Sequence, residues 1–368
     1  MMPSEELDAW HMARALELAA RGEGLVEPNP MVGCVIVRDG ETVGEGWHRR
    51  FGGPHAEVEA LKVAGGRARG ATAYVTLEPC CHHGKTPPCT QALIAAGVSR
   101  VVIAQRDPFP KVAGGGIAEL EAAGIAIEVG SGAEEARRLN APYLKLVEHG
   151  LPWIIAKWAM TLDGKLATAT GDSRWISGEA SRAIVHRLRG RVDGIMVGSG
   201  TALADDPLLT ARPAGVRTPA RIVLDSQARL PLTSQLVKTA GEAPVIVAVA
   251  SNALPEHGRA LERAGCEVLR CPGASPAERL PALLAELGRR QMTNVLVEGG
   301  AQLLGSLFDA GQVDEAHVFI APKLVGGGAA PGPIGGDGRR LMAEAVSLIN
   351  PAIDQAGTDL YVRGRLSR

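Results

Sequence analysis

The sequence predicts two α/β domains that join near residue 149. The chain has 368 residues, which suggests two domains of roughly 100–200 residues each. Both halves alternate short β-branched runs with segments of helical periodicity, a pattern typical of α/β domains with mainly parallel sheets. Gly150 is followed closely by Pro152, and this pair marks a break in regular structure. We therefore expect one domain over residues 1–148 and a second over residues 149–368.

The first half is expected to begin with an apolar-periodic helix and a hairpin. The turn Asp39-Gly40 lies between two strand-like runs and is a strong hairpin signal. The expected helices are 5–21, 55–64, 88–96, 116–123 and 132–147, and the expected strands are 31–37, 42–46, 72–77, 99–104 and 125–129.

The second half repeats this alternation with different motifs. The expected strands are 153–157, 194–197, 221–224, 245–249, 267–270, 294–297, 316–320 and 360–366, and the expected helices are 178–190, 256–264, 276–289 and 300–310. Gly- and Pro-rich loops at 112–116, 212–219 and 325–338 are too short to be linkers, so we expect them to cover sites.

The composition excludes several classes of protein. A formal net charge of −1 without long runs of one sign gives no basic surface for nucleic acid or for an acidic membrane. Aromatic residues make up 3%, too few for a base-stacking surface. No apolar stretch is long enough for a membrane span or a signal peptide. We expect a cytoplasmic protein, where six cysteines are better suited to metal binding than to disulfides.

Three of the six cysteines lie in one loop, and an isolated His-x-Glu precedes them. Catalytic zinc takes three protein ligands and leaves one position for water, and His55, Cys80 and Cys89 would supply this set. His55 and Cys89 both follow prolines and are expected to open helices. Helix N-termini favour thiolate over thiol. Glu57 would then lie near the metal-activated water without being a ligand.

This pattern has two interpretations. His-x-Glu followed by Pro-Cys is the signature of zinc nucleobase deaminases, although their second cysteine lies three residues after the first and here it lies at Cys89. The alternative is a structural Cys/His site that also uses Cys81, His82 or His83. Structural sites usually have paired close spacings, and His55 stands alone with its Glu57. The catalytic interpretation is therefore favoured.

The first half resembles the deaminase domain of the bifunctional deaminase/reductase family of riboflavin biosynthesis. The resemblance is carried by the runs 27–37, 55–57, 78–89 and 106–108. It implies a cytidine-deaminase-like, three-layer α/β/α domain, with His55, Cys80 and Cys89 as zinc ligands and Glu57 as the proton shuttle. Cys81 stands where family members usually carry Ser.

Several neighbouring residues have open roles. Asn29 is a plausible contact for a pyrimidine edge, because an amide can donate and accept together, or else a turn residue between two prolines. His48 could face the pocket or be structural. His82, His83 and Lys85 could contact a substrate phosphate or be exposed loop residues.

The second half contains no Gly-x-Gly-x-x-Gly after an early strand, so the usual dinucleotide-binding fold lacks support. The segment 294–304 instead predicts a strand, a Gly-Gly turn and a helix. Such a turn can admit a phosphate, but on its own it is weak evidence for a phosphate site. The runs 157–165, 171–177, 197–210, 221–226 and 321–324 resemble the reductase domain of the same family. The resemblance implies a dihydrofolate-reductase-like fold.

That resemblance also implies the site residues of the second half. The positions that would bind NADPH are Ala159, Trp175, Thr201, Asp205, Ser226, Gly300, Ala301, Gln302, Leu303, Leu304, Gly305 and Ser306. The positions that would bind the ribose phosphate substrate are Ser173, Arg189, Leu209, Arg212 and Glu298. Lys157 ends a buried strand, where a lysine is costly unless paired or used, and could polarise the sugar. Arg189 could instead lie on a solvated helix face, Asp205 could be a turn residue and Trp175 could be core.

Together the two halves imply zinc-dependent deamination of a small pyrimidine ribotide, followed by NADPH-dependent reduction of its ribosyl side chain. The family also suggests a homo-oligomer. One rival is a nucleoside or tRNA deaminase with a structural second domain. A second rival is a non-catalytic zinc module, and a third is a chain with one inactive domain. Cys266 and Cys271 lie outside both motifs.

Overall fold

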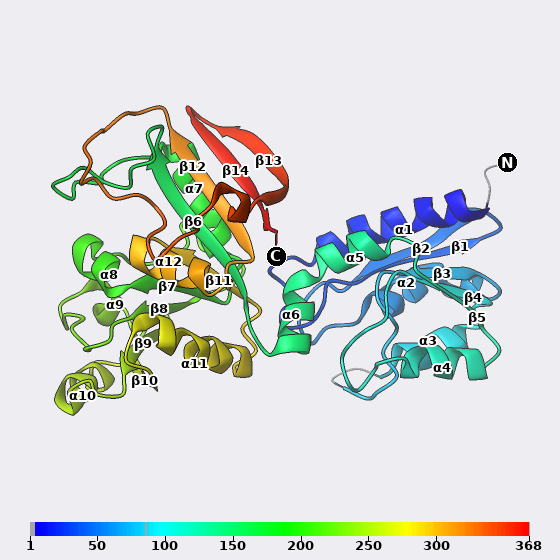
Figure 1. Cartoon of the computed structure of the whole chain (residues 1–368). Helices are drawn as coiled ribbons and strands as arrows, with labels where there is room; N and C mark the ends of the chain where they lie inside the picture. Colours follow the sequence, from blue (N-terminus) through cyan, green and yellow to red (C-terminus); the bar gives the residue numbers. More distant parts are fainter. Residues whose placement is uncertain (1–3, 85–86, 368) are drawn as a thin grey trace. The chain divides into compact units, whose positions relative to one another are not determined.

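The computed structural model describes residues 4–84 and 87–367, and the chain divides into two compact units between Gly150 and Leu151 (Figure 1). Each unit has its own sheet and its own hydrophobic core. The boundary predicted after residue 148 falls at the end of the helix Ala141–His149.

The first unit contains a five-stranded mixed sheet in the order β2-β1-β3-β4-β5. Its strands are β1 (Gly33–Arg38), β2 (Glu41–Trp47), β3 (Thr72–Val75), β4 (Arg100–Ile103) and β5 (Ala126–Val129). Its helices are α1 (Ser4–Ala20), α2 (Ala56–Ala64), α3 (Cys89–Ala96), α4 (Gly115–Ala122), α5 (Ala133–Leu139) and α6 (Ala141–His149), with a short 3₁₀ turn at Gly65–Ala68. The predicted hairpin is confirmed as β1–β2, whereas parallel pairing is confined to β3, β4 and β5.

Helices cover both faces of this sheet, which confirms the three-layer α/β/α prediction. On one face Met12 and Leu18 of α1 pack with Ala136 of α5 against the sheet (Figure 1). On the other face the apolar residues of α2, α3 and α4 pack against alternate strand positions. The single helix predicted over 132–147 is wrong. It is interrupted at Asn140, because Pro142 cannot continue the hydrogen-bond ladder of α5.

A close approach between β2 and α2 fixes the start of α2. A Cβ atom at Gly46 would lie 2.4 Å from the carbonyl oxygen of Ala56, so only glycine allows this contact. The approach places the first turn of α2 against the sheet. The predicted metal ligand His55 is the residue immediately before this helix.

The second unit contains a nine-stranded sheet in the order β10-β9-β8-β7-β11-β6-β12-β14-β13. Its strands are β6 (Trp153–Thr161), β7 (Gly194–Gly198), β8 (Ala220–Leu224), β9 (Val245–Ala250), β10 (Glu267–Cys271), β11 (Asn294–Glu298), β12 (Glu315–Ala321), β13 (Leu348–Ala356) and β14 (Asp359–Leu366). Its helices are α7 (Glu179–Arg189), α8 (Ser199–Asp205), α9 (Gln235–Lys238), α10 (Pro255–Arg263), α11 (Pro276–Arg289) and α12 (Ala301–Asp309), with a 3₁₀ turn at Met342–Glu344. The seven strands from β10 to β12 are parallel, as predicted, and β14 and β13 add antiparallel strands at one edge.

The two faces of this sheet carry different helices. Leucines of α11 and α12 pack with β7, β8 and β11 in the largest core, while α7 packs with Phe319 and Tyr361 on the opposite face. Two predictions were wrong in detail. The strand β13 was missed, because it is an exposed edge strand with Pro351 at a bulge. Lys157 lies in the middle of β6 rather than at its end.

Candidate active sites

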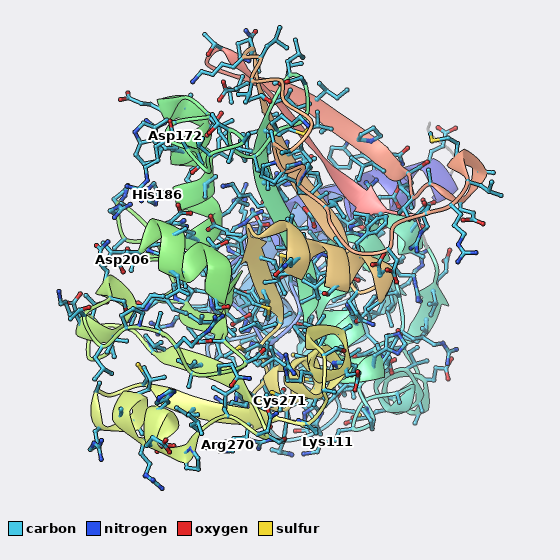
Figure 2. All side chains as sticks on the ribbon, turned by 60° about the vertical axis from the view of Figure 1, so that its left-hand side comes forward. Lys111, Asp172, His186, Asp206, Arg270 and Cys271 are labelled. Atoms are coloured by element: carbon cyan, nitrogen blue, oxygen red, sulfur yellow. The ribbon has the colours of Figure 1, made fainter. Side chains whose placement is uncertain are left out.

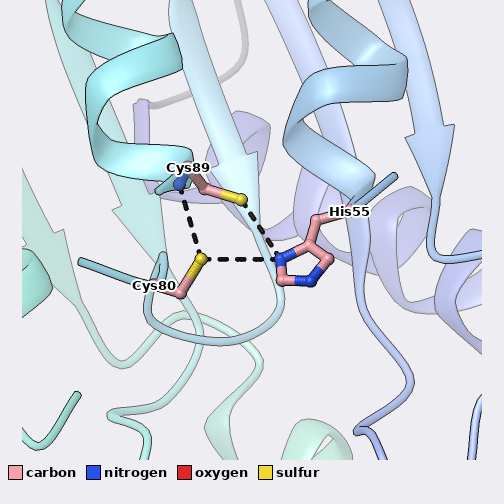
Figure 3. Close-up of side chains that lie close together, drawn as sticks. All are labelled: His55, Cys80 and Cys89. Atoms are coloured by element: carbon pink, nitrogen blue, oxygen red, sulfur yellow. Dashed lines mark hydrogen bonds between the residues drawn. The ribbon is translucent and has the colours of Figure 1, made fainter. Parts of the chain in front are cut away.

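The three predicted metal ligands of the first unit meet at one point (Figure 3). His55 Nδ1 lies 3.5 Å from Cys80 Sγ and 3.3 Å from Cys89 Sγ. All three ligating atoms lie within 4.8 Å of one another. Cys81, by contrast, faces the carbonyl oxygen of Lys111 at 3.6 Å. The geometry therefore selects Cys80 and Cys89 as the sulfur pair.

Helix termini hold two of these ligands. His55 is the N-cap of α2, and Cys89 is the first residue of α3. The main-chain N–H of Cys89 donates to Cys80 Sγ at 3.4 Å, so the start of α3 stabilises a thiolate there. Hydrogen bonding from Cys89, together with His55, lowers the pKa of Cys80 to about 4. A thiolate is the form of cysteine that binds metal.

Glu57 lies in the first turn of α2 and is 3% exposed. Burial raises the pKa of its carboxyl group, and the neighbouring Cys80 adds to this effect while His55 opposes it. Among the described residues its Oε2 atom has no hydrogen-bond partner. A buried carboxylate oxygen without a partner is costly. A His/Cys/Cys donor set beside such an oxygen fits a zinc ion with an open position for water.

A second histidine orients Asn29. His48 Nδ1 lies 3.0 Å from the carbonyl oxygen of Pro54, so this nitrogen carries the proton and Nε2 accepts from the Asn29 amide at 3.2 Å. The His48 ring also packs edge-on against the His55 ring, with centroids 5.2 Å apart. Burial lowers the pKa of His48, which favours this neutral state. Asn29 is therefore held by a side chain that contacts the metal cluster.

Sequence reasoning missed the role of Glu78. Its buried carboxylate accepts hydrogen bonds from the backbone N–H groups of Asp107, Gly114, Gly116 and Ile117, at 3.0–3.2 Å. These bonds tie the loop before α4 and the first turn of α4 to the chain just before Cys80. The available signal was its position directly before Pro79-Cys80, within the run 78–89.

In the second unit a cleft of about 1000 Å³ lies along the sheet, at the upper end of the range for small-molecule sites. Figure 2 labels three of its lining residues, His186 on α7, Asp206 after α8 and Cys271 at the end of β10. The predicted site residues that line the cleft are Lys157, Ala159, Ser173, Trp175, Arg189, Thr201, Asp205, Leu209, Arg212, Ser226, Glu298, Gly300, Ala301, Gln302 and Leu303.

Three predicted cofactor residues do not line this cleft. Leu304 is 1% exposed and belongs to the hydrophobic core. A Cβ atom at Gly305 would lie 2.3 Å from the backbone of Gly335, so this glycine allows two segments to pack. The Ser306 hydroxyl donates to the carbonyl oxygen of Gln302 within α12. Only the first turn of α12, after the left-handed Gly299 and Gly300, faces the cleft.

A triad of largely buried charged side chains lies in the cleft. The Arg189 guanidinium donates to both carboxylate oxygens of Glu298, at 2.5 and 3.0 Å, and Lys157 Nζ lies 3.6 Å from the same carboxylate. Although burial alone would raise it, the pKa of Glu298 is held at about 2 by these two cations. Burial lowers the pKa of Lys157. Arg189 therefore does not lie on a solvated helix face.

Trp175 is an exposed residue rather than a core residue. Its ring is 65% exposed, and the Arg182 guanidinium lies 4.8 Å from the ring centroid. Lys323 Nζ donates to the Trp175 carbonyl oxygen at 2.6 Å, and Arg174 donates to the carbonyl oxygen of Asp205 at 2.8 Å. These contacts hold the loop at the mouth of the cleft.

Comparisons with known proteins match both units. Residues 5–105 match the cytidine and deoxycytidylate deaminase zinc-binding region, and residues 152–359 match the RibD C-terminal domain. The chain is 45% identical to the riboflavin biosynthesis protein RibD of Actinobacillus pleuropneumoniae, covering 96% of this chain and 94% of that protein. It is 46% identical to RibD of Escherichia coli, covering 88% and 89%.

Solved structures agree with these matches. RibD of Acinetobacter baumannii has a TM-score of 0.87 at 38% identity, covering 99% of this chain and 100% of the other. A diaminohydroxyphosphoribosylaminopyrimidine deaminase/5-amino-6-(5-phosphoribosylamino)uracil reductase of Thermotoga maritima has a TM-score of 0.83 at 34% identity, with the same coverage.

The folds and the metal cluster define a zinc-binding, cytidine-deaminase-like domain joined to a dihydrofolate-reductase-like domain. Each half on its own leaves the substrate open, but both occur here in one chain and in one order. The chain belongs to the RibD family, the bifunctional deaminase/reductases of riboflavin biosynthesis. In its described part no helix is long and apolar enough to cross a membrane.

Proposed function

We propose that the first unit deaminates 2,5-diamino-6-(5-phosphoribosylamino)pyrimidin-4-one at its 2-amino group. The second unit then reduces the ribosyl chain of that product with NADPH, giving 5-amino-6-(5-phosphoribitylamino)uracil. The observation that carries the proposal is the convergence of His55, Cys80 and Cys89 beside the unpartnered buried oxygen of Glu57. The name of the Thermotoga maritima relative contains the same pair of activities.

In the deaminase site, His55, Cys80 and Cys89 would hold the zinc ion, which when bound activates a water molecule as the nucleophile. Glu57 takes a proton from that water at Oε2 and delivers it to the pyrimidine ring nitrogen. A second proton is then transferred to the amino group. The new C–O bond forms, the C–N bond breaks and ammonia leaves. Asn29, oriented by His48, pairs with the polar edge of the pyrimidine.

In the reductase site, bound NADPH would supply a hydride to C1 of the ring-opened, imine-like sugar, whose nitrogen takes up a proton. The cleft fits such a cofactor, because the Gly299-Gly300 turn exposes the start of α12, where backbone N–H groups bind phosphate. The Lys157 ammonium polarises the sugar. Glu298 keeps Lys157 and Arg189 in place, and Arg189 with Arg212 binds the ribotide phosphate.

A stoichiometric assay tests this proposal. Purified protein would be given the diaminopyrimidine ribotide and NADPH, with ammonia release and NADPH oxidation followed together. One ammonia and one NADPH per ribotide, with ammonia first, is the expected result. Ammonia release without NADPH oxidation would contradict the proposed reduction. NADPH oxidation without ammonia release would remove the proposed deamination.

The predicted homo-oligomer is also part of the proposal. It is supported by the edge strand β13, where Ile349 and Ile353 are 53% and 65% exposed, since exposed apolar patches commonly mark interaction surfaces. Light scattering of wild type and Ile353→Lys would test it, and a wild-type monomer would contradict it. The cytoplasmic location and the lack of a nucleic-acid partner remain predictions.

A further inference from the structure

One end of the reductase cleft is lined by cationic and hydroxyl side chains that the triad does not use. Ser226 follows β8, Cys271 ends β10 and Arg279 lies in the first turn of α11. All three line the cleft, as does Arg229. Figure 2 labels Cys271. Ser226 is expected to contact the cofactor, but nothing assigns a ligand group to the two arginines.

Arg279 is a buried cation whose hydrogen bonds all go to neutral acceptors. It is 8% exposed. Its Nη1 donates to the carbonyl oxygens of Gly273 and Ala274 at 3.0 and 3.1 Å, and its Nη2 donates to Ser226 Oγ at 2.5 Å. Within the described chain, none of its hydrogen-bond acceptors is a carboxylate. Arg189, a partly buried arginine of the same cleft, is instead bound by Glu298. Buried charges are normally paired and hydrogen-bonded to their counter-charge, and Arg279 donates to no anion among the described residues.

Neither acidic neighbour in the chain fills this role. Glu278 accepts hydrogen bonds from the Ala274 backbone N–H and the Ser275 hydroxyl, at 3.1 and 2.9 Å. Asp225 is 1% exposed and accepts a hydrogen bond from the Leu230 backbone at 2.7 Å. Its other oxygen lies 3.8 Å from Arg229 Nε. In Rossmann-type sites an acidic residue after a strand binds the ribose 2′-hydroxyl of NAD, whereas an arginine accommodates the 2′-phosphate of NADP, and the same charge chemistry applies to any site for these cofactors. Here Asp225 is bonded to the loop that follows it. Ser226 and Arg279 line the cleft instead.

The order of the strands places this end away from the reacting groups. Lys157 and Glu298 lie on the neighbouring strands β6 and β11, the Gly-Gly turn follows β11, and Ser226 follows β8, two strands further along. A dinucleotide whose nicotinamide lies near Lys157 and whose pyrophosphate lies near Gly300 would bring its adenosine ribose to Ser226.

We propose that Arg279, with Ser226 and Arg229, binds the 2′-phosphate of NADPH and makes the reductase selective for NADPH over NADH. This inference rests on the proposed reduction and adds the residues that choose the cofactor. The Arg279 fork can bind the phosphate with donors left over from its three internal bonds. Arg229, whose side chain is 60% exposed, adds charge at the rim.

The test compares kcat/KM for NADPH and for NADH in wild type, Arg279→Gln, Arg279→Lys and Arg229→Gln. Arg279→Gln is expected to lower the NADPH value about 10- to 100-fold, as for a lost charged hydrogen bond, with the NADH value nearly unchanged. Arg279→Lys should recover part of the loss, and Arg229→Gln should lose less. Arg289→Gln, on the exposed surface of the same helix, is the matched control and should match wild type. An equal loss for both cofactors, or an unchanged ratio, overturns the inference.

A binding measurement keeps the test decisive if Arg279→Gln does not fold. Calorimetry on wild type and Arg279→Lys would compare adenosine 2′,5′-bisphosphate with adenosine 5′-monophosphate. We expect the bisphosphate to bind wild type at least about tenfold more tightly, and Arg279→Lys to reduce that difference. Equal affinities in wild type contradict the inference. Selective binding without NADPH oxidation during ribotide turnover would contradict only the proposed reduction.

Discussion

The deaminase site and the reductase cleft differ in how their functional residues are distributed along the chain. The metal ligands and Glu57 all fall within residues 55–89, and the three ligands surround one point. The cleft takes side chains and backbone from β6, α7, α8, β8, β11 and α12. A metal site depends on every ligand, whereas an extended cofactor is held by many contacts of small individual energy. Single substitutions at the metal site should therefore abolish deamination. Single substitutions in the cleft should lower the reductase activity by degrees.

The largest effect is expected for a metal ligand. Cys89→Ala should remove stoichiometric zinc and lower ammonia release by roughly 10³-fold or more, because the metal supplies several kcal/mol of transition-state stabilisation. NADPH oxidation with pre-deaminated ribotide should stay at the wild-type level. Zinc would be measured by atomic emission spectroscopy. Cys81→Ser is the matched control, since Cys81 Sγ faces a backbone carbonyl, and its loss of zinc would contradict the assignment of ligands.

In the cleft, the largest effect is expected for Glu298→Gln. This change leaves Arg189 and Lys157 buried without their counter-charge, and breaking a buried pair costs about 3–5 kcal/mol. The free energy of unfolding of the second unit should fall by that order, and NADPH oxidation should fall with it. Glu267→Gln, which removes a partly exposed pair with Arg290, should cost no more than about 1 kcal/mol. Equal denaturation midpoints for the two variants would contradict this account.

A pH profile sharpens the comparison. Because burial lowers the pKa of Lys157 below its ordinary value of 10.5, the ammonium form is present below the lowered pKa and is lost as pH rises through it. NADPH oxidation with pre-deaminated ribotide should therefore fall on the alkaline side before pH reaches 10.5. In Lys157→Arg this alkaline fall in activity should move to higher pH, since arginine stays protonated. If the activity of Lys157→Arg falls at the same pH as that of wild type, Lys157 is not the group that titrates.

The smallest effect is expected for Trp175→Ala. The ring is exposed and stacks with Arg182, a contact of about 0.5–1 kcal/mol. KM for NADPH should rise about two- to fivefold with little change in kcat. Steady-state kinetics at saturating ribotide would measure this. A loss of kcat beyond tenfold would mean that Trp175 acts on the reacting groups rather than on cofactor binding.

The deaminase site could be predicted from the sequence more completely than the reductase cleft, because its residues lie close together in the chain. His55, Glu57, Cys80 and Cys89 form a short motif whose residue types specify a chemistry, and the structure brings the three ligands together. Most predicted cleft residues line the cavity, but Gly305 belongs to a packing contact with Gly335. A run of residues after a Gly-Gly turn does not reveal which side of the helix faces a ligand.

Interactions between distant segments were not predictable from local pattern. Arg189 and Glu298 were both expected in the site, yet their mutual ion pair joins positions 109 residues apart. Glu78 lies within the motif, but its four backbone partners come from a distant loop and the first turn of α4. The strand β13 was missed because its stability comes from pairing with β14 rather than from its own apolar pattern.

The most direct test of the central claim is the Glu57→Ala variant, assayed for both activities on one preparation. With the diaminopyrimidine ribotide, the account predicts that ammonia release falls by about 10²–10⁴-fold, the contribution of a general acid–base, while zinc is retained. With pre-deaminated ribotide, NADPH oxidation should equal that of wild type. Glu59→Gln, a partly exposed neighbour on the same helix, serves as the control. Wild-type ammonia release from Glu57→Ala would contradict the account at its centre.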